Sequence, residues 1–152
     1  MKSRIYHTES EEETIALGGK IAAELPASAV VLLIGQLGAG KTTLAKGIVK
    51  GLGAAASDDV SSPTFTLIHE YSPRVFHIDL YRLDTAAQVA TLGLDEIFDR
   101  PAIVLIEWGE RFPELLPDDR IEIRLRALEE NSREIEVRST IKEAPPPCRD
   151  SA

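Results

Sequence analysis

The sequence is poor in cysteine, in long apolar runs and in positive charge, and each shortage excludes a class of protein. Its single cysteine, Cys148, excludes an intramolecular disulfide and any cysteine-based metal cluster. The longest apolar run, residues 29–34, is far shorter than the roughly 20 residues of a membrane-spanning helix. A formal net charge of -8 argues against direct binding to DNA or to an RNA phosphate backbone. The polar, acidic first residues resemble neither a secretory signal nor a transit peptide, so we expect a cytoplasmic protein without membrane contact.

Apolar residues recur with the periods of helices and strands in turn. Runs that are apolar on both faces predict two strands buried in a parallel sheet, at residues 29–34 and 102–106. A helix is expected from the capping-box pattern at Ser10 to residue 25, and a second helix over residues 41–52. Weaker patterns predict short strands at 65–71 and 75–80, a broken helix at 85–98, and an antiparallel hairpin formed by 121–125 and 135–137.

This order of elements predicts a three-layer α/β fold with a mainly parallel sheet and an antiparallel edge hairpin. We expect one domain over residues 1–141. Residues 142–152 are rich in proline and have no apolar pattern to bury, so we expect a disordered C-terminal tail.

Residues 35–42, with the sequence GQLGAGKT, fit the G-x-x-x-x-G-K-S/T motif of phosphate-binding loops. The loop follows a predicted buried strand and opens a predicted helix, whose N-terminus favours negative charge. We therefore predict a P-loop NTPase-like domain in which Lys41, as a catalytic residue, reaches the β- and γ-phosphates and Thr42 binds Mg²⁺. The nucleotide-binding residues expected in this loop are Gly35, Gly38, Ala39, Gly40, Lys41, Thr42 and Thr43.

Two acidic residues at the ends of predicted strands are further candidates for catalysis. Glu107 follows the apolar run 102–106, where a carboxylate that binds Mg²⁺ beside the phosphate loop is expected. Asp79 ends another apolar run and could hold a metal-bound water or polarise the attacking one. His77 points to the same side of its strand as Asp79, so it either orients that carboxylate or is a hydrogen-bonded structural residue.

The base of the nucleotide is predicted to be adenine. A guanine site would be expected to carry an N-K-x-D element, and the chain's one asparagine, Asn131, is not part of such an element. The start of the first helix is a candidate adenine pocket with Ser10 as a binding residue; alternatively, Ser10 only caps the helix. Thr64 is expected either to sense the γ-phosphate as part of a nucleotide-dependent switch or to be a plain turn residue.

Four strings occur in order along the chain: GQLGAGKTT at 35–43, SPTF at 62–65, HIDLYRL at 77–83 and IEW at 106–108. Together they resemble the TsaE family, and the resemblance spans residue 10 to about residue 137. One departure is Gln36, where the family often has an acidic residue. That change leaves the phosphate loop intact, because this position contributes its backbone N–H group.

The resemblance implies that Thr42 and Glu107 hold Mg²⁺, that Asp79 is needed for ATPase activity, and that the segment around Thr64 responds to the nucleotide. It also implies an ATPase subunit required for tRNA threonylcarbamoyladenosine modification. Because no arginine in the chain is an obvious finger for the γ-phosphate, we expect slow hydrolysis by the protein alone. Its hydrolysis of ATP is expected to support or reset an assembly of the TsaD and TsaB proteins, which contact tRNA in its place. Two alternatives stay open: a small-molecule kinase and a non-catalytic ATP-binding switch.

Overall fold

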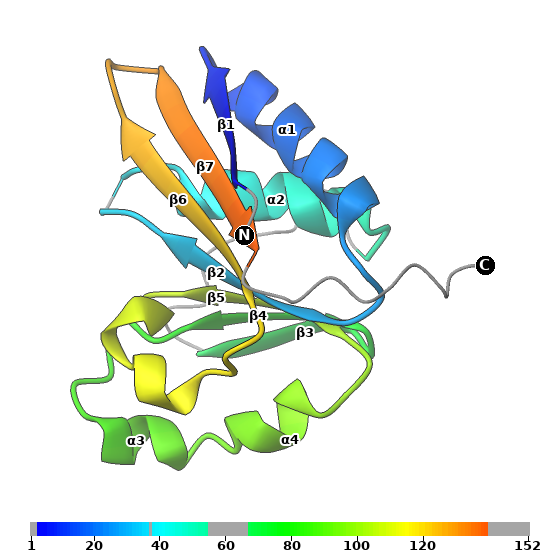
Figure 1. Cartoon of the computed structure of the whole chain (residues 1–152), viewed down its shortest axis with the longest axis vertical. Helices are drawn as coiled ribbons and strands as arrows, with labels where there is room; N and C mark the ends of the chain where they lie inside the picture. Colours follow the sequence, from blue (N-terminus) through cyan, green and yellow to red (C-terminus); the bar gives the residue numbers. More distant parts are fainter. Residues whose placement is uncertain (1–2, 37, 55–66, 140–152) are drawn as a thin grey trace.

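The computed structural model describes residues 3–36, 38–54 and 67–139, and within them seven strands form one sheet (Figure 1). The strands are β1 (Ser3–Thr8), β2 (Ala29–Ile34), β3 (Ile68–Ser72), β4 (Val75–Asp79), β5 (Ile103–Glu107), β6 (Ile121–Ala127) and β7 (Arg133–Ser139). The helices are α1 (Glu11–Glu24), α2 (Lys41–Gly51), α3 (Ala86–Ala90) and α4 (Leu94–Phe98), with 3-10 turns η2 (Gly109–Arg111) and η3 (Pro113–Leu115). The predictions for Thr64 and for the tail 142–152 lie outside the described residues.

The sheet has a parallel centre and antiparallel edges. Its strand order is β1-β7-β6-β2-β5-β4-β3. The central pairs of β6 with β2, β2 with β5, and β5 with β4 are parallel, and the outer pairs are antiparallel. The predicted α/β fold with its parallel core and its antiparallel hairpin is therefore confirmed. Because the carboxyl ends of β2, β4 and β5 meet at one edge of the sheet, that edge is where a ligand site is expected.

β1 was not predicted from the sequence, and it extends the sheet beyond the predicted β6–β7 hairpin. It pairs antiparallel with β7 over its whole length, from Ser3 beside Arg138 to Thr8 beside Arg133. Its first residues are exposed, and only Thr8 is buried. A strand that buries so little of its surface has no strong apolar alternation, so the sequence pattern did not reveal it.

Alternate residues of the central strands supply two separate cores. Val31 and Leu33 of β2 pack with the core beneath α1 and α2, whereas Val30 and Leu32 join the core on the opposite face. Figure 1 shows α1 and α2 on one side of the sheet, and α3, α4 and the 3-10 turns on the other. Because both faces are covered, β2 is apolar at every position, as expected of a three-layer fold.

Glycines allow α1 and α2 to pack closely. A Cβ atom added to Gly47 would lie 2.0 Å from the carbonyl oxygen of Ile15, and one added to Gly18 would lie 2.7 Å from that of Leu44. Only residues without a side chain permit this approach of two backbones. The contact holds α2, and the loop that precedes it, against the rest of the domain.

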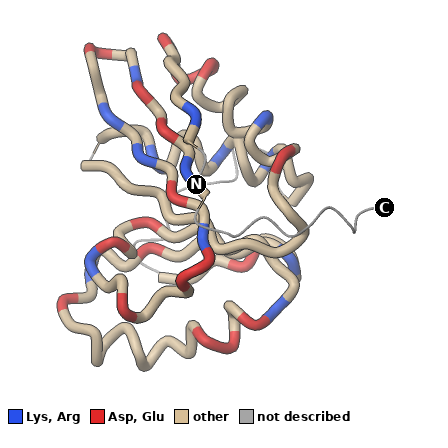
Figure 2. The backbone as a smooth tube through the Cα atoms, in the orientation of Figure 1, with Lys and Arg blue, Asp and Glu red and all other residues tan. Residues whose placement is uncertain are grey.

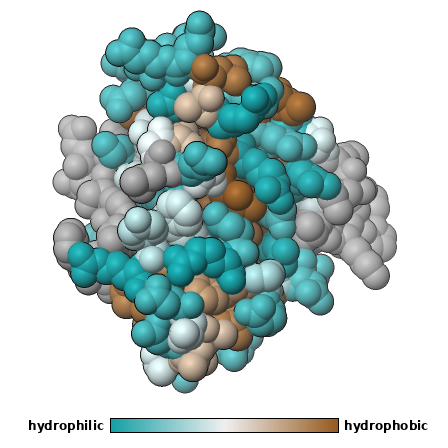
Figure 3. All heavy atoms as spheres, turned by 90° about the vertical axis from the view of Figure 1, so that its left-hand side faces the viewer, coloured by the Kyte–Doolittle hydropathy of each residue, from teal (hydrophilic) through white to brown (hydrophobic). Residues whose placement is uncertain are grey.

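Acidic and basic residues are both spread over the described part of the chain (Figure 2). Along β6 and β7 they alternate with apolar residues, and Arg126 pairs with Glu134 across the two strands at 2.7 Å. The face in Figure 3 is largely hydrophilic, and hydrophobic residues reach it in separate patches. Among the described residues, no helix combines the length and the apolar character that crossing a membrane requires.

Candidate functional site

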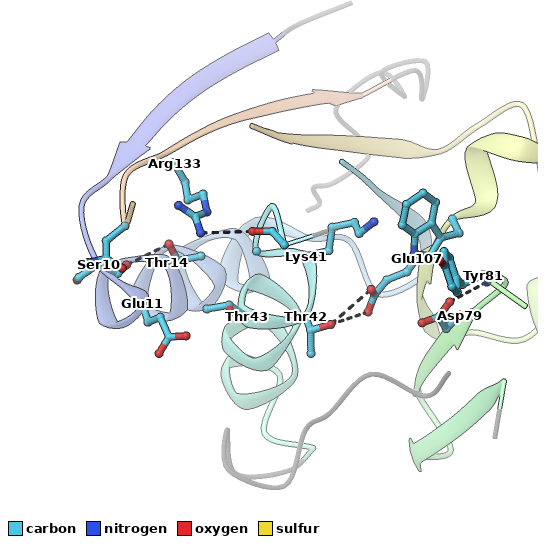
Figure 4. A pocket seen from close by; sticks show the side chains of 14 residues that line it. Ser10, Glu11, Thr14, Lys41, Thr42, Thr43, Asp79, Tyr81, Glu107 and Arg133 are labelled. Atoms are coloured by element: carbon cyan, nitrogen blue, oxygen red, sulfur yellow. Dashed lines mark hydrogen bonds between the residues drawn. The ribbon is translucent and has the colours of Figure 1, made fainter. Parts of the chain in front are cut away.

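A cavity of about 510 Å³ lies at the carboxyl ends of β2, β4 and β5. Its lining side chains come from the start of α1, the loop after β2, the ends of β4 and β5, and the start of β7 (Figure 4). The lining residues are Ser10, Glu11, Thr14, Gly38, Gly40, Lys41, Thr42, Thr43, Asp79, Tyr81, Glu107, Trp108, Asn131 and Arg133. A cavity of this volume is in the range that binds small molecules and cofactors.

Most of the predicted site residues line this one cavity. They are Ser10, Gly38, Gly40, Lys41, Thr42, Thr43, Asp79 and Glu107. Gly35 and Ala39 belong to the same loop but border a hollow on its β6 side. An added Cβ atom at Gly35 would lie 2.7 Å from the carbonyl oxygen of Leu125, so this glycine lets the loop approach β6.

The loop leads into α2 through a left-handed residue. Gly40, the residue before α2, has a φ of 102°, a conformation that residues with side chains rarely adopt. No side chain caps the N-terminus of α2. The first N–H groups of this helix therefore lack a side-chain acceptor at the point where the cavity opens, which suits an anion.

Lys41, the first residue of α2, is buried. Its Nζ atom donates to the carbonyl oxygen of Gly35 at 2.6 Å and lies 3.4 Å from the centroid of the Trp108 ring. Burial lowers the pKa of the Lys41 ammonium, and the negative charge of Glu107 partly offsets this effect. The cation is thus held inside the cavity by uncharged groups.

β4 and β5 bring the two predicted carboxylates together beside Thr42. Asp79 and Glu107 are neighbours in the parallel register of these strands, and both are buried. Thr42 Oγ1 lies 3.4 Å from Oε1 and 3.3 Å from Oε2 of Glu107, as the dashed lines in Figure 4 mark. The backbone N–H of Tyr81 donates to Oδ1 of Asp79 at 2.8 Å, which fixes that carboxylate.

These oxygen atoms suit Mg²⁺. In nucleotide-binding proteins Mg²⁺ is usually held by one or two carboxylates together with waters and phosphate oxygens. Within the ranges that the structure describes, no three His, Cys, Asp or Glu side chains are grouped to hold a metal by themselves. The hydroxyl of Thr42 and the carboxylate of Glu107 therefore fit an ion that bound phosphates would help to hold.

His77 contacts Glu107, which the sequence did not predict. The sequence left two interpretations open: His77 orients Asp79, two residues later on the same strand, or it is a hydrogen-bonded structural residue. In the structure, His77 Nε2 lies 2.6 Å from Glu107 Oε2, and both side chains are buried. The contact joins two strands that are far apart in the sequence, so no local pattern could have indicated it.

Ser10 both caps α1 and lines the cavity. Its hydroxyl accepts a hydrogen bond from the N–H of Glu13 at 3.1 Å, and the Glu13 carboxylate accepts one from the N–H of Glu9 at 2.8 Å. The buried hydroxyls of Thr8 and Thr14 lie 2.7 Å apart nearby. Capping is thus confirmed, and binding of a base by Ser10 stays a prediction.

Arg133 is a cavity residue that sequence reasoning missed. From the start of β7, its Nε donates to the carbonyl oxygen of Ala39 at 3.1 Å and its Nη2 to that of Gly38 at 3.3 Å. Asn131, just before β7, lines the same side of the cavity. In the sequence, Arg133 is one charged residue in an alternating strand, and its position depends on how the sheet is ordered.

Aromatic rings line the other side of the cavity, and a partly buried carboxyl group follows β5 in the chain. The rings of Tyr81 and Trp108 lie 5.1 Å apart, and Arg111 donates to the carbonyl oxygens of Tyr81 and Leu83. Glu110 has a buried Oε1 atom without a hydrogen-bond partner among the described residues. Burial raises the pKa of the Glu110 carboxyl, while a backbone hydrogen bond and the charge of Lys41 act in the opposite direction.

Residues 8–135 match the family model described as "Threonylcarbamoyl adenosine biosynthesis protein TsaE". The chain belongs to the TsaE family. The match includes both Ser10 and Arg133, so it spans the whole described cavity. Membership of the TsaE family assigns the chain to tRNA threonylcarbamoyladenosine biosynthesis and implies that it binds ATP.

Individual TsaE proteins agree with this assignment, and one solved structure is similar in sequence and fold. A tRNA threonylcarbamoyladenosine biosynthesis protein TsaE from Bacillus subtilis is 40% identical over 138 residues, which covers 89% of this chain and 85% of the relative. One from Nostoc sp. is 42% identical over 134 residues, covering 84% and 80%. The crystal structure of YdiB from Bacillus subtilis superimposes with a TM-score of 0.74 and 34% identity, covering 91% of this chain and 86% of that one.

Proposed function

We propose that the chain is a cytoplasmic Mg²⁺-dependent ATPase subunit whose ATP hydrolysis supports or resets an assembly of TsaD and TsaB during tRNA threonylcarbamoyladenosine modification. The observation that carries this proposal is the convergence of Lys41, Thr42, Asp79 and Glu107 on one cavity at the carboxyl edge of the sheet. The net charge of -8 favours contact with tRNA through the partners, because direct contact calls for a basic surface.

Each side chain has a distinct part in this proposal. Lys41 and the N-terminus of α2 bind the phosphates of ATP, and Thr42 and Glu107 hold Mg²⁺, which supplies positive charge that offsets the charge of the transferred phosphoryl group. Asp79 orients the water that attacks the γ-phosphorus. The bond from that phosphorus to its bridging oxygen breaks, and the products are ADP and inorganic phosphate.

The direct test is steady-state release of inorganic phosphate from Mg-ATP by the chain alone, with TsaD or TsaB singly, and with both. We expect slow hydrolysis by the chain alone and strong acceleration with both partners. The arginine that lines the described cavity, Arg133, already donates to loop carbonyls. An arginine supplied by a partner can raise the rate of hydrolysis by a factor of about 10³ to 10⁵. Fast hydrolysis by the chain alone, at a rate that the partners do not change, would contradict the proposal.

The metal site has a separate test in Glu107→Gln. Removing this charge is expected to weaken nucleotide binding in Mg²⁺ more than binding in EDTA, because the charge acts through the cation. Glu70→Gln, on the exposed side of β3, is the control and should change neither affinity. An unchanged Mg²⁺ titration of Glu107→Gln would move the metal site, with Asp79 as its next candidate.

The same assays distinguish the two alternatives. Phosphate transferred to a small-molecule acceptor, in place of release as inorganic phosphate, would indicate a kinase. Tight ATP binding without turnover under any condition, including with both partners present, would indicate a non-catalytic switch.

A further inference from the structure

His77 and Glu107 form a buried pair beside the cavity. They come from the neighbouring parallel strands β4 and β5, and their exposed fractions are 0% and 3%. His77 Nε2 lies 2.6 Å from Glu107 Oε2. In the register of the strands, His77 lies beside Leu105 and Asp79 lies beside Glu107. The ring therefore reaches diagonally along the sheet to Glu107, and His77 itself does not line the cavity.

The Glu107 carboxylate is held from two directions. An ionised carboxylate only accepts hydrogen bonds, so Nε2 of His77 is the donor. On the cavity side, the hydroxyl of Thr42 lies 3.3 to 3.4 Å from the two carboxylate oxygens. Of these two neighbours, only Thr42 lines the cavity and could share a ligand with Glu107. His77 is thus placed to orient the carboxylate and not to contact the ligand.

Apart from Nε2, the described contacts of the His77 ring do not require an imidazole. Its Nδ1 atom is buried and has no hydrogen-bond partner among the described residues. An unpaired buried nitrogen is unfavourable, and an apolar ring of similar size would avoid it. The neighbouring ring, Tyr71, lies 6.4 Å away in a stacked arrangement that a phenylalanine would also permit. What distinguishes the imidazole at this position is the donor that faces Glu107.

We propose that His77 is a positioning residue of the magnesium site, an inference that rests on the proposed function. Its Nε2–H group holds Oε2 of Glu107 and so orients the carboxylate beside the Thr42 hydroxyl. Partners of this kind set the orientation of a metal-binding side chain, and their loss typically lowers metal affinity about 10- to 100-fold.

The test compares ADP affinity in MgCl₂ and in EDTA by calorimetry, together with Mn²⁺ binding to the ADP complex by electron paramagnetic resonance. His77→Phe keeps the ring and removes the donor, so the gain in affinity from Mg²⁺ should fall at least tenfold while affinity in EDTA is unchanged. His77→Gln places an amide N–H near the position of Nε2, so its gain in affinity from Mg²⁺ should stay within about threefold of the wild-type gain. His69→Phe, an exposed histidine beside His77 in the β3–β4 register, is the matched control.

His77→Asn provides a second variant without the donor, should His77→Phe fail to fold. The asparagine side chain is one bond shorter than that of glutamine, so its amide should not reach Glu107. His77→Asn should therefore lose the gain in ADP affinity from Mg²⁺, and His77→Gln should keep it. Retention of the full Mg²⁺ effect by His77→Phe or His77→Asn would overturn this inference alone. If the ADP affinity of the wild-type protein is the same in MgCl₂ and in EDTA, the proposed metal site is wrong, and this inference is wrong with it.

Discussion

The ammonium of Lys41 lies over the face of the Trp108 ring, 3.4 Å from its centroid. Its second partner is the carbonyl oxygen of Gly35. Both groups offer only partial negative charge, and burial lowers the pKa of the ammonium. Phosphate oxygens are stronger partners, because a hydrogen bond between two charged groups is stronger than a hydrogen bond to a neutral acceptor. Lys41 is therefore held where a phosphate would bind, by contacts that a phosphate would outcompete.

Lys41→Ala is expected to lower the affinity for Mg-ATP at least tenfold, or about 1.4 kcal/mol, because the phosphate charge loses its buried cation. Calorimetry with Mg-ATP measures this change directly. Lys50→Ala, at an exposed position in the last turn of the same helix, should leave the affinity unchanged. A Lys41→Ala affinity within about threefold of wild type would place the phosphates elsewhere.

Arg133→Ala should weaken both the fold and nucleotide binding. The change frees the carbonyl oxygens of Gly38 and Ala39, so the free energy of unfolding should fall by about 1–3 kcal/mol and nucleotide affinity by about tenfold. Urea denaturation and calorimetry provide the two measurements. Arg126→Ala breaks only a solvent-exposed pair with Glu134 and should cost under about 1 kcal/mol. Equal effects of the two variants would show that Arg133 does not support the loop.

Two glycine substitutions test the α1–α2 contact. Gly47→Ala would bring a methyl group to 2.0 Å from the carbonyl oxygen of Ile15, so it should destabilise the fold by about 1–3 kcal/mol or more. Gly19→Ala meets nothing within 4 Å and should stabilise α1 by about 0.5–1 kcal/mol. The melting temperatures of the two variants, measured by thermal denaturation, should therefore shift in opposite directions from wild type. A shift of both in the same direction would contradict the described contact.

The Glu110 carboxyl predicts a pH dependence of stability. Burial raises its pKa in the folded state, so its contribution to stability is complete below the ordinary carboxyl value and is lost as the pH rises through the raised value. Glu110→Gln does not titrate, so its melting temperature relative to wild type should rise as the pH increases above the ordinary carboxyl pKa of about 4.3. Glu129→Gln, exposed beyond β6, should show no such trend. A parallel pH profile of Glu110→Gln and wild type would refute the prediction.

The features that the sequence predicted have local signatures. β2 and β5 are apolar on both faces, the phosphate loop has fixed spacing, and Asp79 and Glu107 stand at the ends of strands. A parallel sheet then brings those ends together without further information.

The features that the sequence did not reveal depend on which strands become neighbours. Arg133 reaches the phosphate loop because β7 follows β6, which pairs with β2. The contact between His77 and Glu107 exists because β4 adjoins β5. β1 buries little surface, so its residues show no pattern beyond that of a polar segment. Each of these is a tertiary relationship between residues whose own neighbours in the chain are unremarkable.

The position of β2 between β5 and β6 constrains how the protein is made. During translation, β2 and the phosphate loop leave the ribosome well before either strand that pairs with β2. Until then both edges of an apolar strand are unpaired, and such edges promote aggregation of nascent chains. The carbonyl oxygens of Gly38 and Ala39 obtain their donors only when Arg133, at the start of β7, emerges. The complete nucleotide site therefore needs a chain that extends to β7, and a nascent chain that stops before β5 lacks both Glu107 and Arg133.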